Sequence, residues 1–353
     1  MKRRQHRAGG ENGAAPPAHH RPGGGFRNPW RDFAPDIPQG FFAWARAHRT
    51  TNPRPLDPDP SIFPRASPAF ASPRAHDAAL TVTWVGHATF LIQIGGLNIL
   101  TDPIWSERPS PIAFAGPRRW VPPGAPLDAL PPIDVVLLSH NHYDHFDSRT
   151  ARRLARLHPD ARWLVPLELG ALVRRKGPKH VEELDWWNES RLATVVVTCT
   201  PAQHWSARGL RDRGNSLWCG WTMRSGARAV YFAGDTAFFP GFREIGERCG
   251  PFDFALLPIG GYEPRWFMRF VHMGPEEAVQ AFVELSRGDT HPVMIPMHFG
   301  TFKLTDEAMD EPPRRLRAAW IDAGLPARQL GVFAHGESRS LAVRSDDLIQ
   351  SDV

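Results

Sequence analysis

The sequence has too few cysteines to form a disulfide framework. Its 353 residues include three, Cys199, Cys219 and Cys249, an odd number without close spacing. This usage is typical of free thiols in a reducing compartment. No apolar run approaches the roughly 18 residues of a membrane-spanning helix, and residues 1–25 lack the apolar segment of a secretory signal. We therefore expect a cytoplasmic protein, with a peripheral position on the membrane as the alternative.

The sequence also has little net charge outside its first residues. The formal net charge is +5, but residues 1–25 carry five Lys or Arg side chains against the single carboxylate of Glu11. The rest of the chain is close to neutral, which argues against a nucleic-acid partner. The mixture of Gly, Pro and charge in residues 1–25 predicts a disordered basic arm. The alternative, a more specific role, is that this arm contacts an anionic membrane surface.

Regular structure is expected only after residue 78. Residues 26–78 are rich in proline and aromatic residues and predict an extended wrap around a core, with one helix over 38–49. No repeat with a period of 20 to 50 residues is present, which excludes a solenoid. We divide the remainder into a catalytic domain over 79–343 and a tail over 344–353.

Strand and helix patterns alternate within the catalytic domain. Residues 80–102 predict a hairpin that turns at Gly95 and Gly96. The run "IDVVLL" is typical of a strand buried on both faces, and the helical pattern after it begins with Asp147 or Ser148 as its N-cap. Later helical patterns occupy "GFREIGERC" and "GPEEAVQAFVELS". Strands outnumber helices, so we expect a mixed α/β sandwich of two sheets flanked by helices.

A cluster of imidazole and carboxylate groups follows "IDVVLL" directly. The eight residues "HNHYDHFD" contain three histidines and two aspartates. Such groups need a partner that offsets their desolvation, and a metal ion is the obvious candidate. In an extended loop His140 and His142 point the same way, whereas Asp144 and His145 turn toward a second position. One loop can therefore supply two metal sites.

Three further strand ends supply ligands of the same kinds: His204, Asp235 and His298. With Asp235 as a bridging carboxylate, the seven residues form two sites of four ligands each. Imidazole and carboxylate without thiolate suit Zn²⁺ better than iron or manganese. We therefore expect two Zn²⁺ ions per chain.

Short motifs surround these ligands along the chain. The narrowest are "ELDWW", "YEPRWFM" and "HGESR", and others are "FRNPW", "TWVGHATF", "LTDPIWS", "TPAQHW", "FAGDT" and "HFGTF". Together with the HxHxDH pattern at residues 140–145, they resemble the N-acyl-phosphatidylethanolamine-hydrolysing phospholipase D family of the metallo-β-lactamase superfamily. HxHxDH alone is specific only to the superfamily, and the resemblance extends over residues 26–341.

This resemblance implies a metallo-β-lactamase αβ/βα four-layer sandwich that acts as a homodimer on a phospholipid at a membrane surface. It also implies which residues hold each zinc ion: His140, His142 and His204 for one, Asp144, His145 and His298 for the other, and Asp235 for both. His272 matches a histidine that the family places near the substrate. Val271 and Phe299 stand where the animal enzymes have Gln and Trp, and we expect these changes to affect the pocket and to leave the metal chemistry intact.

The expected chemistry is attack on a phosphodiester by a hydroxide held between the two Zn²⁺ ions. Asp144 would orient this hydroxide and relay its proton, and His272 would assist the leaving alkoxide or hold the phosphate.

Five other residues have expected supporting roles. Asp102 would fix the orientation of a ligand imidazole, with a surface turn as an equal alternative. Tyr143 and Tyr262 would line the pocket. For His87 and His335, a hydrogen-bonded structural role is favoured over metal ligation.

The sequence thus predicts a zinc-dependent phosphodiesterase of phospholipase D type, which hydrolyses N-acyl-phosphatidylethanolamine to N-acylethanolamine and phosphatidic acid. The alternative is a hydrolase of the same fold that acts on a lactone or on another phosphodiester, such as a nuclease. A nuclease would need a basic channel that the near-neutral body does not offer. A non-catalytic metal protein would be expected to lack a ligand, and none of the seven is missing.

Overall fold

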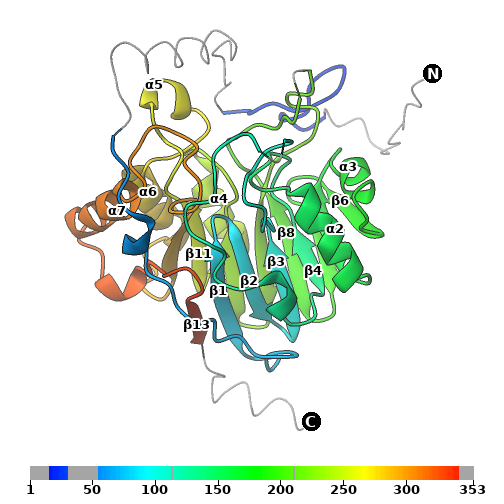
Figure 1. Ribbon diagram of the computed structural model, residues 1–353, viewed down its shortest axis with the longest axis horizontal. Coiled ribbons are helices and arrows are strands. Elements are labelled where there is room, and N and C mark those ends of the chain that lie inside the picture. Colours follow the sequence, from blue (N-terminus) through cyan, green and yellow to red (C-terminus); the bar gives the residue numbers. More distant parts are fainter. Residues whose placement is uncertain (1–15, 31–54, 113, 210, 342–353) are drawn as a thin grey trace.

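The computed structural model describes residues 16–30, 55–112, 114–209 and 211–341. Within these ranges the strands form two sheets packed face to face (Figure 1). The first sheet has the order β13-β1-β2-β3-β4-β5-β6, with bounds β1 (Leu80–Gly86), β2 (Thr89–Ile94), β3 (Leu97–Thr101), β4 (Val135–Leu137), β5 (Arg162–Pro166), β6 (His180–Leu184) and β13 (Ser338–Leu341). The second has the order β12-β11-β10-β9-β8-β7, with bounds β7 (Glu189–Leu192), β8 (Val195–Thr200), β9 (Gly220–Ser225), β10 (Arg228–Phe232), β11 (Phe254–Pro258) and β12 (Val293–Met297).

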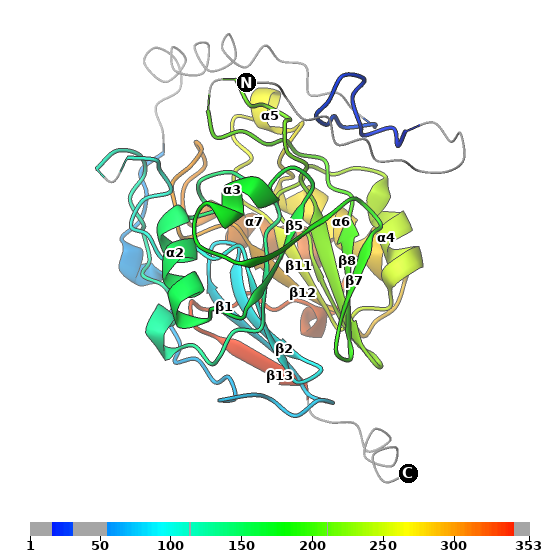
Figure 2. The same ribbon diagram turned by 90° about the vertical axis from the view of Figure 1, so that its right-hand side faces the viewer.

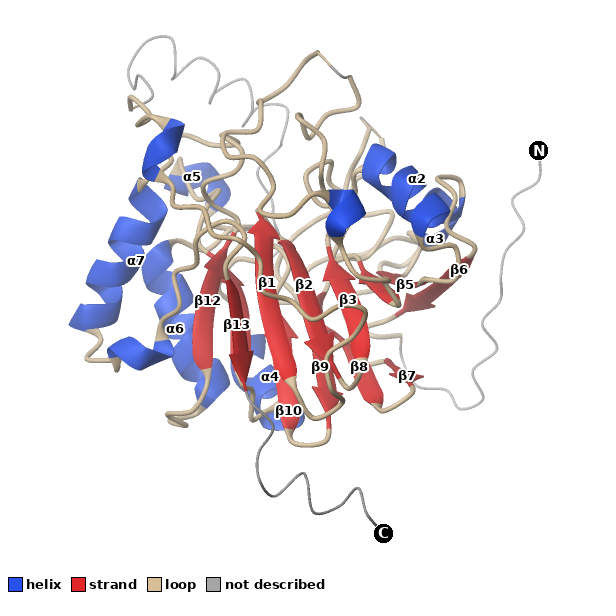
Figure 3. Cartoon of the chain, turned by 60° about the horizontal axis from the view of Figure 1, so that its bottom comes forward, coloured by secondary structure: helices blue, strands red, loops and turns tan. Residues whose placement is uncertain are grey.

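Helices cover the outer faces of both sheets. The α-helices are α2 (Ser148–Leu157), α3 (Gly170–Arg174), α4 (Gly241–Cys249), α5 (Arg265–Met268), α6 (Pro275–Ser286) and α7 (Glu311–Asp322), and short 3-10 turns occupy Pro60–Ile62, Leu127–Ala129 and Ala327–Gln329. Figure 2 shows the layers in order, with α2 and α3 on one side, the two sheets between, and α4 and α6 on the other side. Figure 3 shows α7 beside α6 on that second side. This is the four-layer αβ/βα order that the sequence predicts.

Strand β4 shows how the apolar pattern builds these layers. Val135 and Leu137 belong to the core between the two sheets, whereas Val136 and Leu138 pack in a second core beneath α2. Successive side chains of a strand point to opposite faces, so a continuous apolar run can be buried on both. Burial of each such side chain contributes roughly 1.5–3 kcal/mol. The prediction of a strand buried on both faces is confirmed.

The predicted hairpin is present, and a further strand precedes it. Strands β2 and β3 pair antiparallel around Gly95 and Gly96, whose φ angles are +57° and +71°. A side chain at Gly95 would collide with Ser225 and Thr194 across the sandwich, so glycine is required there on two counts. The first apolar run forms β1, which pairs with β2.

Helix positions agree closely with the sequence pattern. Asp147 is the N-cap of α2 and accepts a hydrogen bond from the backbone N–H of Arg149, which satisfies one of the free donors of the first turn. Pro275 occupies the first position of α6, where its lack of an N–H costs nothing. The helix predicted over 38–49 lies outside the described residues. No helix in the described part of the chain has the length and apolar character to cross a membrane.

The expectation of a disordered arm over 1–25 is wrong for residues 16–25. His19 is buried, and backbone hydrogen bonds join Phe26 N to Gly214 O at 2.7 Å and Arg27 N to His19 O at 2.9 Å. The composition of this segment predicts disorder, but its contacts are made with residues far along the chain, such as Asp185. Residues 1–15 and 342–353 lie outside the described residues.

Candidate metal centre

The seven predicted ligands meet at one edge of the sandwich. The loop after β4 carries four of them, and the segments after β8, β10 and β12 carry one each. The last three strands belong to the second sheet and β4 belongs to the first, so the site lies between the two sheets. Apolar strands fix the backbone, and polar side chains begin where each strand ends.

Asp235 lies at the centre of the cluster. Its Oδ2 atom is 3.1 Å from His145 Nε2 and 3.2 Å from His298 Nε2. The same oxygen is 3.9 Å from His140 Nε2 and 3.8 Å from His204 Nε2. One carboxylate oxygen therefore faces imidazole nitrogens from two sides.

The remaining distances divide the cluster into two groups. His142 Nδ1 lies 2.9 Å from His140 Nε2 and 3.3 Å from His204 Nε2. On the other side of Asp235, Asp144 Oδ2 lies 3.3 Å from the Nε2 atoms of both His145 and His298. These are the two groups that the family resemblance implies. The three imidazoles of the first group are near enough to share one cation, and so are Asp144, His145 and His298 together with His87 in the second.

A second layer of hydrogen bonds orients the imidazoles. Asp102, fully buried, accepts hydrogen bonds from the backbone N–H and the hydroxyl of Ser139, and its Oδ2 lies 2.7 Å from His145 Nδ1. His140 Nδ1 lies 2.8 Å from the Ser139 hydroxyl oxygen, and His204 Nδ1 lies 2.8 Å from the carbonyl oxygen of Val271. With Nδ1 occupied, each of these rings presents Nε2 to the centre. The expected contact of Asp102 with a site imidazole is present.

The charge balance of the cluster calls for cations. Burial would raise the pKa values of Asp144 and Asp235, but the neighbouring histidines, His145 together with His298, outweigh this effect and hold both well below the usual carboxyl range. Burial would likewise lower the pKa of His298, but the charge of Asp235 and the hydrogen bond to Asp144 raise it to about 9. Without metal, buried carboxylates are thus balanced by protons held on imidazoles. Divalent cations satisfy the same demand.

The other three imidazoles are held in the form that binds metals. Burial, reinforced by neighbouring imidazoles, lowers the pKa of His140 well below its ordinary value and that of His142 to about 3. Burial also lowers the pKa of His204 to about 4, against the opposing charge of Asp235. Neutral imidazole is the form that ligates.

Several buried polar atoms of the cluster lack a hydrogen-bond partner among the described residues: His142 Nε2, His145 Nε2, Asp235 Oδ1 and His298 Nδ1. An unpaired buried polar atom is costly and marks a place where an ion or water is expected. The donor set, the burial and these atoms together fit divalent metal ions.

A cavity of about 300 Å³ opens above the cluster. The polar part of its lining consists mainly of His142, Asp144, Asp235, His272 and His298, and the apolar part includes Trp205, Phe267, Met268, Val271 and Leu304. The His272 ring is 5.0 Å from that of His204 and 5.4 Å from that of His298, and its Nδ1 has no hydrogen-bond partner among the described residues. His272 thus lies where a molecule in the cavity would reach it.

Two expectations about the pocket are wrong. Tyr262 is fully buried and does not line the cavity, because its hydroxyl donates to Glu311 at 2.8 Å. Its neighbour Gly261 faces the cavity instead. Phe299 also points away from this cavity and stacks on Trp84 with ring centroids 5.0 Å apart. Tyr143 does line the cavity, as predicted.

The structure adds contacts that the sequence did not reveal. His87 Nε2 lies 3.0 Å from Asp144 Oδ2, so this histidine bonds to a site carboxylate. The Arg208 guanidinium donates to the carbonyl oxygens of Asn141 and Phe146 and lies over the Tyr143 ring, which fixes the ligand loop. His335 is buried beside Thr301, consistent with a structural role. In the sequence, Arg208 is recognisable only as a basic residue shortly after the "TPAQHW" motif, which does not predict its contacts with the ligand loop.

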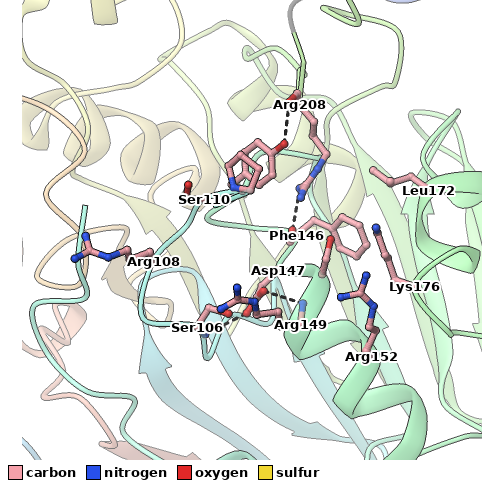
Figure 4. A pocket seen from close by; sticks show the side chains of 13 residues that line it. Ser106, Arg108, Ser110, Phe146, Asp147, Arg149, Arg152, Leu172, Lys176 and Arg208 are labelled. Carbon is pink, nitrogen blue, oxygen red and sulfur yellow. Dashed lines mark hydrogen bonds between the residues drawn. The ribbon is translucent and has the colours of Figure 1, made fainter. Parts of the chain in front are cut away.

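A basic cavity of about 260 Å³ shares Tyr143 with the lining of the cavity above the cluster. Figure 4 shows the side chains that line this basic cavity. Five cationic side chains line it: Arg108, Arg149, Arg152, Lys176 and Arg208. Its one carboxylate, Asp147, accepts hydrogen bonds from the N-terminus of α2 and from Thr150. Burial, with the charges of Arg152 and Arg208, lowers the pKa of Lys176. The cavity is therefore a region of positive potential beside the metal cluster.

Comparison with known proteins places these features in context. A family model described as the Beta-lactamase superfamily domain matches residues 97–299. The chain is 41% identical over 252 residues to N-acyl-phosphatidylethanolamine-hydrolyzing phospholipase D 1 of Caenorhabditis elegans. The aligned region covers 68% of this chain and 70% of that protein. It is 32% identical over 247 residues to the mitochondrial N-acyl-phosphatidylethanolamine-hydrolyzing phospholipase D of Saccharomyces cerevisiae. Here the aligned region covers 67% of this chain and 52% of that protein.

A solved structure shares the fold. The metallo hydrolase from the archaeon Ignicoccus hospitalis is 25% identical and matches with a TM-score of 0.58, covering 75% of this chain and 100% of that chain. The residues matched by the family model include all seven members of the cluster.

Proposed function

Because the chain belongs to the N-acyl-phosphatidylethanolamine-hydrolysing phospholipase D family of the metallo-β-lactamase superfamily, and is thus a metal-dependent hydrolase, we propose that it hydrolyses a phospholipid phosphodiester. The substrate is N-acyl-phosphatidylethanolamine, and the products are N-acylethanolamine and phosphatidic acid. The observation that carries this proposal is the cavity above the cluster, which joins a polar floor of imidazole and carboxylate to an apolar wall. An amphiphile with a phosphodiester head needs both surfaces.

The two groups of the cluster would each hold one Zn²⁺ ion. His140, His142 and His204 would hold the first, Asp144, His145 and His298 the second, and Asp235 would contact both. Bound divalent ions lower the pKa of water toward neutrality and attract phosphoryl oxygens.

Residues of the chain itself would position the reactants. The Asp144 carboxylate stays ionised, since His145, His298 and His87 together hold its pKa well below the usual range against the effect of burial, and it would accept a hydrogen bond from water and orient it. His87 and His298 hold this carboxylate in place. His272 lines the cavity and would contact the phosphate or the leaving oxygen.

The apolar wall would bind the hydrocarbon part of the lipid. Trp205, Phe267, Met268 and Leu304 offer aliphatic and aromatic surface beside the cluster. Removal of an acyl chain from water onto such a surface is favourable by roughly 25 cal/mol per Å². This surface also displaces water from the reacting phosphate.

The basic cavity favours an anionic lipid over a neutral substrate. Its cationic side chains lie beside the loop that carries His140 to His145, so their field extends over the entrance to the catalytic cavity. Such a field raises the local concentration of anions and the rate of encounter. We further propose that the enzyme works at a membrane surface as a homodimer, as the resemblance implies.

The proposal is tested with a panel of substrates presented to the purified protein loaded with zinc. The panel contains N-acyl-phosphatidylethanolamine in mixed micelles, bis(4-nitrophenyl) phosphate, a short acyl-homoserine lactone and a single-stranded oligonucleotide. We expect the highest kcat/KM for the phospholipid, with phosphatidic acid as product. Faster turnover of the lactone or of the oligonucleotide, with the phospholipid intact, would overturn the proposal.

A further inference from the structure

A second cluster of metal-ligating side chains lies away from the catalytic centre. His19 Nε2 is 2.6 Å from one carboxylate oxygen of Asp185, and His20 Nε2 is 2.7 Å from the other. The side chains are largely enclosed, with exposed fractions of 8%, 30% and 19% for His19, His20 and Asp185. None of these residues belongs to the seven-residue cluster, and the proposed hydrolysis makes no use of them.

We propose that His19, His20 and Asp185 form a third metal site, which binds a divalent transition-metal ion of the zinc class and fastens residues 16–30 to the catalytic domain. The two imidazole nitrogens and the carboxylate offer ligand atoms that all lie within 4.8 Å of one another. Ligands at about 2.0 to 2.2 Å from zinc lie roughly 3.3 Å apart in a tetrahedral site, so the cluster needs to open only slightly. His20 is partly exposed, so water can take the fourth ligand position.

The surrounding contacts hold these ligands in place. The ring of His19 stacks on Trp186 with centroids 4.1 Å apart and planes inclined by 24°. The backbone N–H of Trp186 donates to Asp185 Oδ1 at 2.8 Å, which orients the carboxylate. Groups that orient ligands from behind are a regular feature of metal sites.

The arrangement resembles that of the catalytic cluster. In both places, imidazole nitrogens converge on a carboxylate at about hydrogen-bond distance, and no thiolate takes part. The donors are of the kinds that zinc prefers. At Asp185, two imidazoles approach separate oxygens of one carboxylate, so a single cation can replace the two protons that otherwise hold the three groups together.

An ion at this site would act on the catalytic centre through the N-terminal segment. Asn28, eight residues after His20, donates a hydrogen bond from Nδ2 to the carbonyl oxygen of His204 at 2.8 Å. Phe26 N bonds to Gly214 O in the loop that follows His204. The third ion therefore secures the segment that supports one of the predicted zinc ligands.

The test is a count of bound zinc in the full-length protein. Wild type and the double variant His19→Ala/His20→Ala are equilibrated against buffered Zn²⁺, passed through a desalting column and analysed for metal. The matched control is His180→Ala/His291→Ala, which removes two exposed histidines outside both clusters. We expect the His19/His20 variant to bind one equivalent less than wild type and the control to bind as much as wild type.

Equal zinc content in wild type and the His19/His20 variant would overturn the proposal. This holds even if the variant melts at a lower temperature, because that result would show that the three side chains only hydrogen-bond to one another. Asp185→Asn serves as a second variant in case the double variant fails to fold, since it keeps both imidazoles and nearly the same shape. It should also bind one equivalent less. Because the readout is metal content, it is independent of whether the phospholipid is the substrate.

Discussion

Asp235 is the residue on which the two groups of imidazoles converge. Its Oδ2 atom is within 4 Å of four histidine Nε2 atoms. An amide in its place keeps the shape but presents no negative charge to the cations. The residue follows the end of β10 by three positions, and the side chains of that strand are buried without it.

We therefore predict that Asp235→Asn lowers kcat/KM on the order of 10³-fold or more while the fold is retained. Turnover is compared with the far-ultraviolet circular dichroism spectrum and with the melting temperature of the metal-stripped proteins. Asp160→Asn, an exposed change on the surface, is the control and should retain full activity. Near wild-type turnover in Asp235→Asn would show that the bridge is assigned to the wrong residue.

Asp102 acts one step further from the centre. Its fully buried carboxylate joins Ser139 and His145, so it fixes the ring of one predicted ligand and, through the Ser139 hydroxyl, that of His140. Loss of such an orienting partner typically weakens metal affinity by about 10- to 100-fold.

We expect Asp102→Asn to show a loss of this size in competition with a zinc chelator. The content of regular structure should stay unchanged, because the backbone pairing of β3 with β4 ends at Thr101, just before this residue. Unaltered zinc affinity in the variant would mean that Asp102 only stabilises the turn after β3.

At the scale of elements, α2 shows how a helix next to the site depends on its buried face. Leu154 is buried in the core beneath the first sheet, whereas Leu157 on the same helix is 46% exposed. Leu154→Ala should lower the free energy of unfolding by about 2–5 kcal/mol, the usual cost of such a cavity. Leu157→Ala should change it by less than about 0.5 kcal/mol. Urea unfolding of the two variants measures both, and equal losses would contradict the assigned packing.

The strand ends were predictable from the sequence because each combines two strong local signals. An apolar run that stops at His140, His204, Asp235 or His298 predicts both a buried strand and a polar group at its edge. His87 and Arg208 could not be predicted in this way. Each is a single polar residue whose partner is determined by the packing of segments more than 50 residues apart.

One of the errors has a local cause and the other has a distant one. Tyr262 is predicted to line the pocket, but it is its neighbour Gly261 that faces the cavity, whereas the Tyr262 hydroxyl donates to Glu311. Residues 16–25 have the composition of a disordered segment, and their contacts with Asp185 span more than 160 residues of sequence. Composition reports the local tendency and carries no information on such distant partners.

At the scale of the whole molecule, the charge distribution should affect substrate capture. Arg149→Glu with Lys176→Glu reverses two charges of the basic cavity, and we expect KM for lipid in anionic vesicles to rise several-fold at low salt with kcat nearly unchanged. The difference should shrink at high salt, where the charges are screened. Arg287→Glu with Arg328→Glu, two changes on the side of α6 and α7, is the control. A loss of kcat without a change in KM would show that the charges of the cavity act in the chemical step and not in substrate capture.

The central claim is that this chain breaks a phosphodiester at phosphorus. The measurement that tests it most directly is hydrolysis of N-acyl-phosphatidylethanolamine in ¹⁸O-water, with both products weighed by mass spectrometry. Two cations at the proposed site would suit the charge that develops on a phosphoryl group, so solvent oxygen should enter phosphatidic acid and be absent from the N-acylethanolamine. Label in a free fatty acid, with no phosphatidic acid formed, would show attack at an acyl carbonyl and would contradict the account.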